Sequence, residues 1–255
     1  MPELLARKTA LILGVANKWS LAYAIAQAFR REGAQLLLTY QGERQKETVT
    51  ELGSELGAAA IFECDVTRDE DLAKLAETVR QHGPLHTLVH SIAFANREDL
   101  TKPFVETSRA GYLLAQDVSA YSLVSAARTV APLMTEGGSV ITLSYLGATR
   151  VVTNYNVMGV AKAALEACVR YLSSDLGPSN IRVNAISAGP VKTASARAVA
   201  GLSKMLETMP TRAPLRRNCT PEEVADAAVF LASDLGRGVT GNVLFVDAGY
   251  QVMGL

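Results

Sequence analysis

Short apolar runs alternate along this chain with longer segments in which apolar residues recur at the helical period. The first run ends at Gly14, and in the segment that follows it Leu21, Ile25 and Phe29 fall on one side of a helix. The runs are almost continuously apolar, which is typical of strands buried on both faces of a sheet. The pattern predicts strands over residues 9–13, 35–40, 60–64, 85–92, 139–144, 181–186 and 243–246. It predicts helices over residues 21–31, 43–56, 70–81, 119–134, 155–176 and 222–233.

Strand and helix follow one another with short turns between them, and this order predicts a parallel sheet with helices on both faces. The sequence contains no repeat and no low-complexity linker. Residues 1–255 are therefore expected to form a single α/β domain, a Rossmann-like doubly wound parallel sheet of about seven strands. Such a sheet binds its ligand at the carboxyl ends of its strands, so the residues at these ends are the first candidates for a site.

The composition narrows the range of possible partners. Of 255 residues, 49% are hydrophobic, which is enough for one large core. Twenty-five basic residues balance 25 acidic ones without a run of like charges, so a nucleic-acid partner is not expected. A net charge of zero also leaves little repulsion between copies of the chain, which permits self-association.

The cysteine and histidine positions argue against a disulfide framework and a metal site. Cys64, Cys168 and Cys219 lie far apart, and no Cys-x-x-Cys pair occurs. The histidines have no cysteine partner nearby to complete a zinc site. The N-terminus lacks a long apolar signal region, and no apolar run is long enough to cross a membrane. We expect a cytoplasmic protein with no metal and no membrane association.

The residues after the first strand suit a phosphate group. Gly14 permits a tight turn and a close approach of a ligand to the backbone. Ser20 stands near the start of the next helix, where free amide groups and the helix dipole favour an anion. Only one glycine remains of the three in the usual dinucleotide-binding loop, so an ordinary turn with a serine cap explains the segment about as well.

The residues after the second strand bear on the choice of nucleotide. In a dinucleotide-binding fold this position meets the adenosine ribose, where proteins that use NAD often carry an acidic residue. No acidic residue stands directly at this strand end, but Gln41 can hydrogen-bond a ribose hydroxyl. Arg44 suits a 2′-phosphate and equally suits the solvated start of a helix. The segment favours NADH over NADPH.

Three further strand ends offer ligand contacts. Asp65, after the third strand, can accept a hydrogen bond from an adenine amino group, although the same carboxylate can cap the following helix. Small residues over 91–95 let the backbone approach a flat ligand. After the sixth strand a Gly-Pro pair forces a turn, and Thr193 suits a phosphate or a carboxamide.

Tyr155 and Lys162 form the most informative pair in the chain. They are seven residues apart, close to two helical turns, and therefore share one face of the predicted helix. A neighbouring cation favours the phenolate, so the pKa of Tyr155 is expected to fall below its ordinary value of about 10. Such a phenol suits an oxygen that gains charge in a transition state. The alternative is a helix with a half-buried tyrosine and an exposed lysine.

Together these residues resemble the short-chain dehydrogenase/reductase family and, within it, the bacterial enoyl-acyl carrier protein reductases. The resemblance covers essentially the whole chain. It rests on Gly14-x5-Ser20-x-Ala22, Cys64-Asp65-Val66, His90-Ser-Ile-Ala-Phe-Ala95, Leu143-Ser-Tyr-Leu-Gly147, Tyr155-Asn-Val-Met-Gly159 with Lys162, and Asn184-Ala-Ile-Ser-Ala-Gly-Pro190.

One spacing separates the subfamilies. Members that reduce ketones carry Tyr-x3-Lys with a serine upstream, whereas enoyl reductases carry Tyr-x6-Lys with a second tyrosine about ten residues before the first. Here position 159 is glycine, and Tyr145 supplies the second tyrosine. Ser144 resembles the upstream serine of a ketone reductase, but that interpretation lacks its lysine.

The resemblance implies reduction of a trans-2-enoyl thioester by NADH. Tyr155 would donate a hydrogen bond and a proton to the thioester carbonyl oxygen, Lys162 would bind the nicotinamide ribose, and Tyr145 would orient the carbonyl. Ala95 would touch the acyl substrate together with the two tyrosines. The implied cofactor contacts are Gly14, Ser20, Leu21, Gln41, Asp65, Val66, Ile92, Ala93, Lys162, Val191 and Thr193.

The resemblance also implies partners. The substrate would be carried by acyl carrier protein, and the apolar C-terminus would lie at a subunit interface of a homotetramer. Residues 194–209 would cover the substrate, although an amphipathic helix packed on the core is the alternative for this segment. Two rival functions are a short-chain dehydrogenase that reduces a carbonyl, and a protein of the same fold that senses NAD(H) without turnover.

Overall fold

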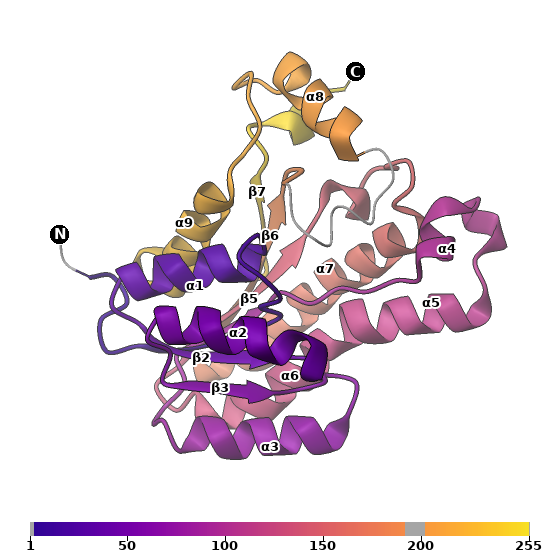
Figure 1. Ribbon diagram of the computed structural model, residues 1–255. Helices are drawn as coiled ribbons and strands as arrows, with labels where there is room; N and C mark the ends of the chain where they lie inside the picture. The colour runs from indigo at the N-terminus through magenta and orange to yellow at the C-terminus, as the bar shows by residue number, and fades with distance from the viewer. Residues whose placement is uncertain (1–2, 192–201, 255) are drawn as a thin grey trace.

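The structure, a computed structural model, describes residues 3–191 and 202–254, with the backbone alone at residue 202. The described strands form one sheet of seven parallel strands in the order β3-β2-β1-β4-β5-β6-β7 (Figure 1). They are β1 (Thr9–Leu13), β2 (Gln35–Tyr40), β3 (Ala60–Glu63), β4 (Thr87–His90), β5 (Gly138–Ser144), β6 (Ile181–Ala188) and β7 (Val243–Val246). The predicted doubly wound sheet is confirmed. Because the strand order reverses between β1 and β4, a crevice for a ligand is expected beyond these two strands.

Helices cover both faces of the sheet. One face carries α1 (Leu21–Arg31), α2 (Glu43–Glu55) and α9 (Pro221–Ala232), and the other carries α3 (Asp69–Arg80), α6 (Ser122–Val130) and α7 (Asn156–Leu176). Apart from α6, these helices begin and end within one residue of the predicted limits. The helical period of the apolar residues was therefore a reliable guide wherever one side of the helix meets the sheet.

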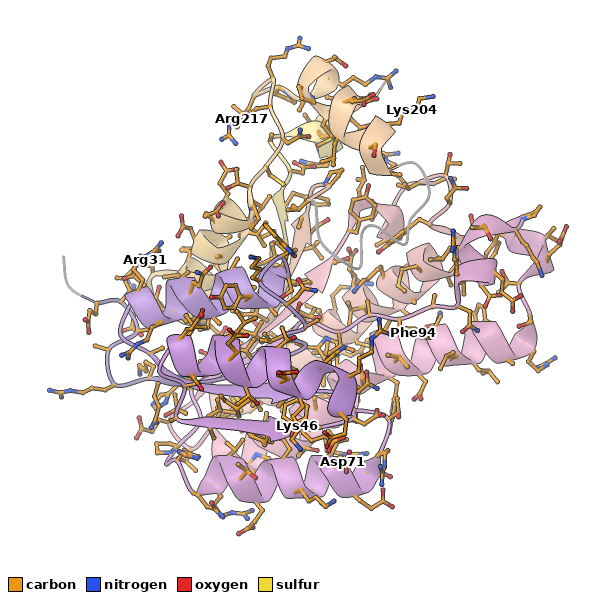
Figure 2. The ribbon with its side chains drawn as sticks, viewed as in Figure 1. Arg31, Lys46, Asp71, Phe94, Lys204 and Arg217 are labelled. Carbon is orange, nitrogen blue, oxygen red and sulfur yellow. The ribbon has the colours of Figure 1, made fainter. Side chains whose placement is uncertain are left out.

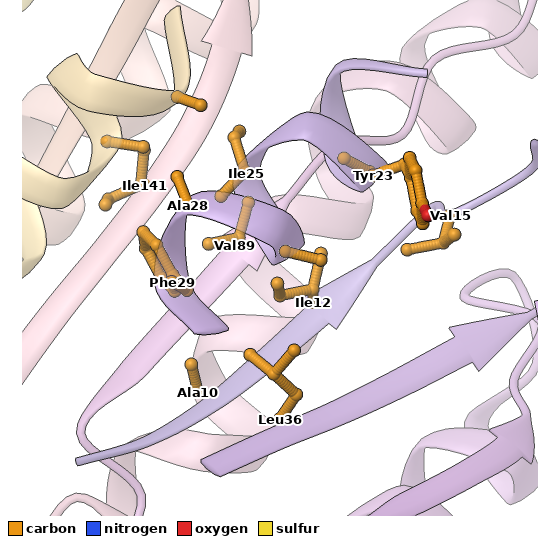
Figure 3. Packing of buried hydrophobic residues seen from close by; sticks show 14 of the residues in the cluster. Ala10, Ile12, Val15, Tyr23, Ile25, Ala28, Phe29, Leu36, Val89 and Ile141 are labelled. Carbon is orange, nitrogen blue, oxygen red and sulfur yellow. The ribbon is translucent and has the colours of Figure 1, made fainter. Parts of the chain in front are cut away.

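The contact between α1 and the sheet shows how this period is used. Ile25 and Phe29 of α1 are fully buried in one cluster with Ile12 of β1, Leu36 of β2 and Val89 of β4 (Figure 3). Burial of each such side chain contributes about 1.5–3 kcal/mol to folding. This packing holds the first turn of α1 beside the carboxyl end of β1.

The predicted helix over residues 119–134 is wrong in its limits. The helical run begins ten residues earlier with α5 (Arg109–Gln116), continues through a π-helical turn at Asp117–Tyr121 into α6, and ends in a 3₁₀ turn at Ala131–Leu133. The pattern of α5 is misleading because its large apolar residues Tyr112 and Leu113 are exposed, whereas its buried residues are small.

Two helices outside the predicted set lie beyond the carboxyl edge of the sheet, and the second of them overlaps the segment 194–209, for which an amphipathic helix was the alternative interpretation. They are α4 (Arg97–Thr101) and α8 (Leu202–Arg212), and α8 contains Pro210. The segment 194–209 predicted to cover the substrate is described only from residue 202, within α8. Over the described ranges, none of the helices combines the length and the apolar character that a bilayer crossing requires.

Candidate active site

A cavity of about 350 Å³ lies at the carboxyl ends of the central strands. The segments that follow β1, β4, β5 and β6 line it, together with the first part of α7 and Met205 of α8. Ten residues predicted from the sequence meet there: Gly14, Ser20, Leu21, Ile92, Ala93, Ala95, Tyr145, Tyr155, Lys162 and Val191. Thr193 falls outside the described residues.

Gly14 allows the two central strand ends to meet. Its φ of +91° lies in the region that favours glycine, and a Cβ at this position would overlap the carbonyl oxygen of Ser91. Ser20 is the N-cap of α1, where its hydroxyl accepts a hydrogen bond from the amide of Tyr23 at 3.2 Å. The capping interpretation of Ser20 is therefore correct, and the same residue also lines the cavity.

The segment 91–95 is held from the π-helical turn. Ser119 is fully buried there, and its hydroxyl accepts from the amide of Phe94 at 2.9 Å and donates to the carbonyl of Phe94 at 3.1 Å. The ring of Phe94 is half exposed beyond the end of the sheet (Figure 2). Met205 was expected as apolar surface for an acyl chain, and it lines the cavity. Sequence reasoning missed Phe94, Leu100 and Met158 as lining residues, because nothing in the local pattern distinguishes them from other apolar residues.

The residues assigned to the adenosine end do not line the cavity and contact one another instead. The Gln41 amide donates to Asp65 Oδ2 at 3.0 Å, while Asp65 Oδ1 accepts from the amide of Thr67 at 2.9 Å and from its hydroxyl at 2.7 Å. Burial opposes the charge on Asp65, but these hydrogen bonds outweigh it and lower the pKa of its carboxyl. Val66 is buried in the core.

Tyr155 stands immediately before α7 rather than within it, because the helix begins at Asn156. The rings of Tyr145 and Tyr155 meet edge to face, with their centroids 5.0 Å apart and their planes at 70°. The Tyr145 hydroxyl donates to Met205 Sδ at 3.7 Å. A second cavity of about 760 Å³ adjoins the first, and the lining residues that the two cavities share are Tyr145, Ala188, Gly189, Pro190 and Met205.

The prediction of a lowered tyrosine pKa is wrong. Burial, with the nearby Tyr145 adding to it, raises the pKa of Tyr155 above its ordinary value. Burial also raises the pKa of Tyr145 to about 12, with Tyr250 adding to it. Both phenols therefore stay protonated at neutral pH and act as neutral hydrogen-bond donors.

Lys162 is buried and hydrogen-bonded, so the alternative of an exposed lysine is also wrong. Its side chain is 5% exposed, and Nζ donates to the carbonyl of Leu143 at 2.7 Å. Burial lowers the pKa of Lys162 to about 8, and Glu166 opposes this effect. The lysine therefore titrates close to physiological pH, unlike the tyrosines.

Two glycines explain the Tyr-x6-Lys spacing in physical terms. A Cβ at Gly159 of α7 would lie 2.8 Å from the carbonyl oxygen of Gly147, in the turn that follows Tyr145. A lysine at 159, where ketone-reducing members carry it, would require this turn to move. A Cβ at Gly147 would in turn overlap the ring of Tyr155. The two glycines therefore let the turn and the tyrosine ring pack directly on α7.

Replacing Gly147 by alanine should lower kcat by about 100-fold, because a shift of about 1 Å in a reacting group can have an effect of that size. Gly147 has no positive φ, so the change tests the position of the Tyr155 ring rather than backbone strain. Gly238→Ala is the matched control, since nothing lies within 4 Å of a Cβ at that position. Steady-state kinetics of both variants give the comparison. A Gly147→Ala enzyme with the kcat of Gly238→Ala would contradict this role.

Comparison with known proteins gives one consistent family. Residues 14–251 match the family described as enoyl-(acyl carrier protein) reductase. An enoyl-[acyl-carrier-protein] reductase [NADH] of Bacillus cereus is 54% identical over 255 residues, which cover 99% of this chain and 100% of that protein. The crystal structure of a Bacillus cereus enoyl-acyl carrier protein reductase with NADP⁺ and indole naphthyridinone has a TM-score of 0.98 at 54% identity, and covers 99% of this chain and 100% of the other.

A reductase structure from Anaplasma phagocytophilum in complex with NAD has a TM-score of 0.95 at 44% identity, and covers 100% of this chain and 96% of the other. Both the sequence match and the structural match extend along nearly the whole chain, including the segments that carry the two tyrosines and the lysine. The chain therefore belongs to the enoyl-(acyl carrier protein) reductase family.

Proposed function

We propose that this protein reduces the carbon–carbon double bond of trans-2-enoyl thioesters of acyl carrier protein with NADH, as the final reductive step of fatty-acid elongation. The observation that carries the proposal is the meeting of Tyr145, Tyr155 and Lys162 in one cavity beyond Gly14. Family membership supports the same reaction.

The residues present fit a dinucleotide. Gly14 lies close to the Ser91 carbonyl and has no side chain, so the space between the ends of β1 and β4 lets a pyrophosphate approach the first turn of α1. Ile92, Ala93 and Val191 give the cavity a largely apolar wall for a nicotinamide ring. Gln41 and Asp65, already joined by a hydrogen bond, would hold the adenosine end together with Val66. Thr193 would contact a phosphate or the carboxamide.

The proposed chemistry assigns one task to each polar side chain. NADH, when bound, supplies the hydride for the β-carbon of the enoyl group. Tyr155 donates a hydrogen bond to the thioester oxygen as that oxygen gains charge, and then a proton. Tyr145, edge-on to Tyr155, orients the carbonyl, and Ala95 contacts the acyl group. Lys162 binds the ribose hydroxyls and keeps positive charge near the developing enolate.

We further propose a cytoplasmic homotetramer. The zero net charge permits copies of the chain to approach one another. Near the C-terminus, Val252 and Met253 are exposed apolar residues that follow the last strand and would be covered by another subunit. Residues 202–209 of α8, with Met205 at the cavity, would cover the substrate.

An absorbance assay with crotonyl thioester tests the reaction, with NADH and NADPH run in parallel. We expect turnover with NADH, because Gln41 offers a ribose hydroxyl a partner without needing a 2′-phosphate. Turnover with NADPH alone would keep the reaction and reverse the choice of cofactor. Reduction of acetoacetyl thioester instead would favour the carbonyl-reducing alternative. Binding of NADH without any turnover would favour the sensing alternative.

A further inference from the structure

Two side chains of α7 hold two consecutive residues at the end of β5. Lys162 Nζ donates to the carbonyl of Leu143 at 2.7 Å, and one helical turn later Glu166 Oε1 accepts from the hydroxyl of Ser144 at 2.5 Å. Leu143 and Ser144 are the last residues of β5, and Tyr145 follows them directly. The position of Tyr145 therefore depends on both contacts from α7.

Glu166 is an unusual residue to find at this place. Its side chain belongs to a residue that is only 7% exposed, and Ser144 is 5% exposed. A buried carboxylate is costly unless it is paired or hydrogen-bonded, and the first effect of burial is to raise the pKa of Glu166. The hydrogen bond from Ser144 and the positive charges of Arg170 and Lys162 offset only part of that rise, so the pKa of Glu166 stays above its ordinary value. Glu166 takes no part in the proposed reaction, so the presence of a carboxylate in the interior at this position needs another explanation.

Among the described residues near Lys162, Glu166 supplies the negative charge, because the other titratable groups that face the lysine are neutral. His90 of β4 is fully buried between Thr142 Oγ1 at 2.9 Å and Ser122 Oγ at 2.8 Å. Burial, and then the charge of Lys162, lower the pKa of His90 to about 3, so it is neutral at working pH. Tyr145 and Tyr155 are neutral phenols with raised pKa values.

We propose that Glu166 is a positioning residue that keeps the buried ammonium of Lys162 charged and, through Ser144, fixes Tyr145 at the end of β5. The charge acts on Lys162, one turn away on the same helix, and the hydrogen bond acts on the strand. This inference rests on the proposed function for the roles of Lys162 and Tyr145. The two actions are separable, because one depends on the negative charge and the other on the hydrogen bond.

Glu166→Gln removes the charge and keeps an oxygen that can accept from Ser144. Glu166 raises the pKa of Lys162 from one helical turn away. Because a nearby opposite charge shifts a pKa by about 1–3 units, we expect the alkaline limb of kcat/KM to move about one pH unit lower. The sign follows from the chemistry: the ammonium is needed, activity falls as pH rises through the pKa of Lys162, and loss of Glu166 lowers that pKa. In this variant the affinity for NADH, measured by fluorescence titration as a function of pH, should begin to fall at a pH about one unit lower than in the unmodified enzyme.

Ser144→Ala removes the hydrogen bond and keeps the charge. We expect its alkaline limb to stay in place while kcat falls severalfold, since Tyr145 is less firmly held. Glu166→Asp, which keeps the charge, should restore the limb toward its original pH. Asp175→Asn is the matched control, because Asp175 is an exposed acid on the same helix and its loss should leave the profile unchanged.

An alkaline limb that Glu166→Gln leaves in place, or that Asp175→Asn moves equally, would overturn the proposal. A Ser144→Ala enzyme with unaltered kcat would overturn the part of the proposal that concerns the position of Tyr145. If Glu166→Gln does not fold, the double variant Ser144→Ala/Glu166→Met removes the charge and both hydrogen-bond partners together. Its alkaline limb, compared with that of Ser144→Ala alone, then tests the action of the charge. The NADH titration also distinguishes the failures: an unmodified enzyme that binds NADH without reducing crotonyl thioester refutes the proposed reaction, while the pH dependence of binding still tests Glu166.

Discussion

Replacing Tyr155 by phenylalanine should lower kcat by about 10²–10³-fold, or about 2.7–4 kcal/mol, and leave NADH affinity unchanged. The phenol is buried at the cavity and neutral, so its contribution is a hydrogen bond and a proton given to an oxygen that becomes charged. The interaction strengthens as charge develops, and its loss therefore raises the barrier rather than weakening the ground state. Stopped-flow kinetics with a separate NADH titration gives both quantities.

Tyr171→Phe is the matched control for this change, since Tyr171 is an exposed tyrosine on the same helix, 75% accessible to solvent. It should behave as the unmodified enzyme does. An equal loss of NADH binding and of kcat in Tyr155→Phe would remove Tyr155 as the acid. Because the pKa of Tyr155 is raised, the alkaline limb of the unmodified enzyme should follow Lys162, whose pKa is about 8, and not a tyrosine.

Replacing Gly14 by alanine should have the largest effect on stability. The positive φ of +91° costs an L-residue about 1–2 kcal/mol, and overlap of the new Cβ with the Ser91 carbonyl adds about 1–3 kcal/mol. The overlap is with backbone, which cannot move unless β1 and β4 separate at the site. Urea unfolding should show a loss of about 2–5 kcal/mol, with nucleotide binding lost as well.

Gly83→Ala isolates the strain in this experiment. Gly83 has a similar φ of +86°, and nothing lies within 4 Å of a Cβ there. We expect only the cost of the positive φ at that position, with nucleotide binding intact. If both variants lose the same free energy of unfolding and both still bind NADH, the close approach of the Ser91 carbonyl is not the reason for glycine at position 14.

Most of the sheet was predictable because burial on both faces leaves a local signature. The strands and the helices packed on them follow from apolar runs and the helical period, with limits correct to about one residue for α1 and α7. The helices beyond the carboxyl edge were not predictable in this way. In α5 the large apolar residues Tyr112 and Leu113 are exposed, so its apolar pattern does not mark its buried side, and α8 carries a proline that normally marks a helix end.

In the candidate site too, the positions of the residues could be predicted from the sequence, whereas the contacts between distant segments could not. Order along the chain places each of Gly14, Ser20, Tyr145, Tyr155 and Lys162 after a strand, at the start of a helix or within one, and the structure brings all five to one cavity. The pairing of Gln41 with Asp65, and the hold of Ser119 on Phe94, join segments more than 20 residues apart in sequence. No local pattern specifies such contacts, so they could not be predicted.

The kinds of reactive group, their spacing and the strand or helix that each one follows or belongs to were determined by the linear order of residues. The protonation states were not. A neighbouring lysine in the sequence predicted an acidic tyrosine, whereas in the folded chain Lys162 donates to Leu143 and burial raises the pKa of Tyr155. A pKa depends on desolvation and on charges brought in from distant segments. These quantities exist only once the chain has packed, and so the chemistry of Tyr155, Lys162 and Glu166 is a property of the tertiary structure.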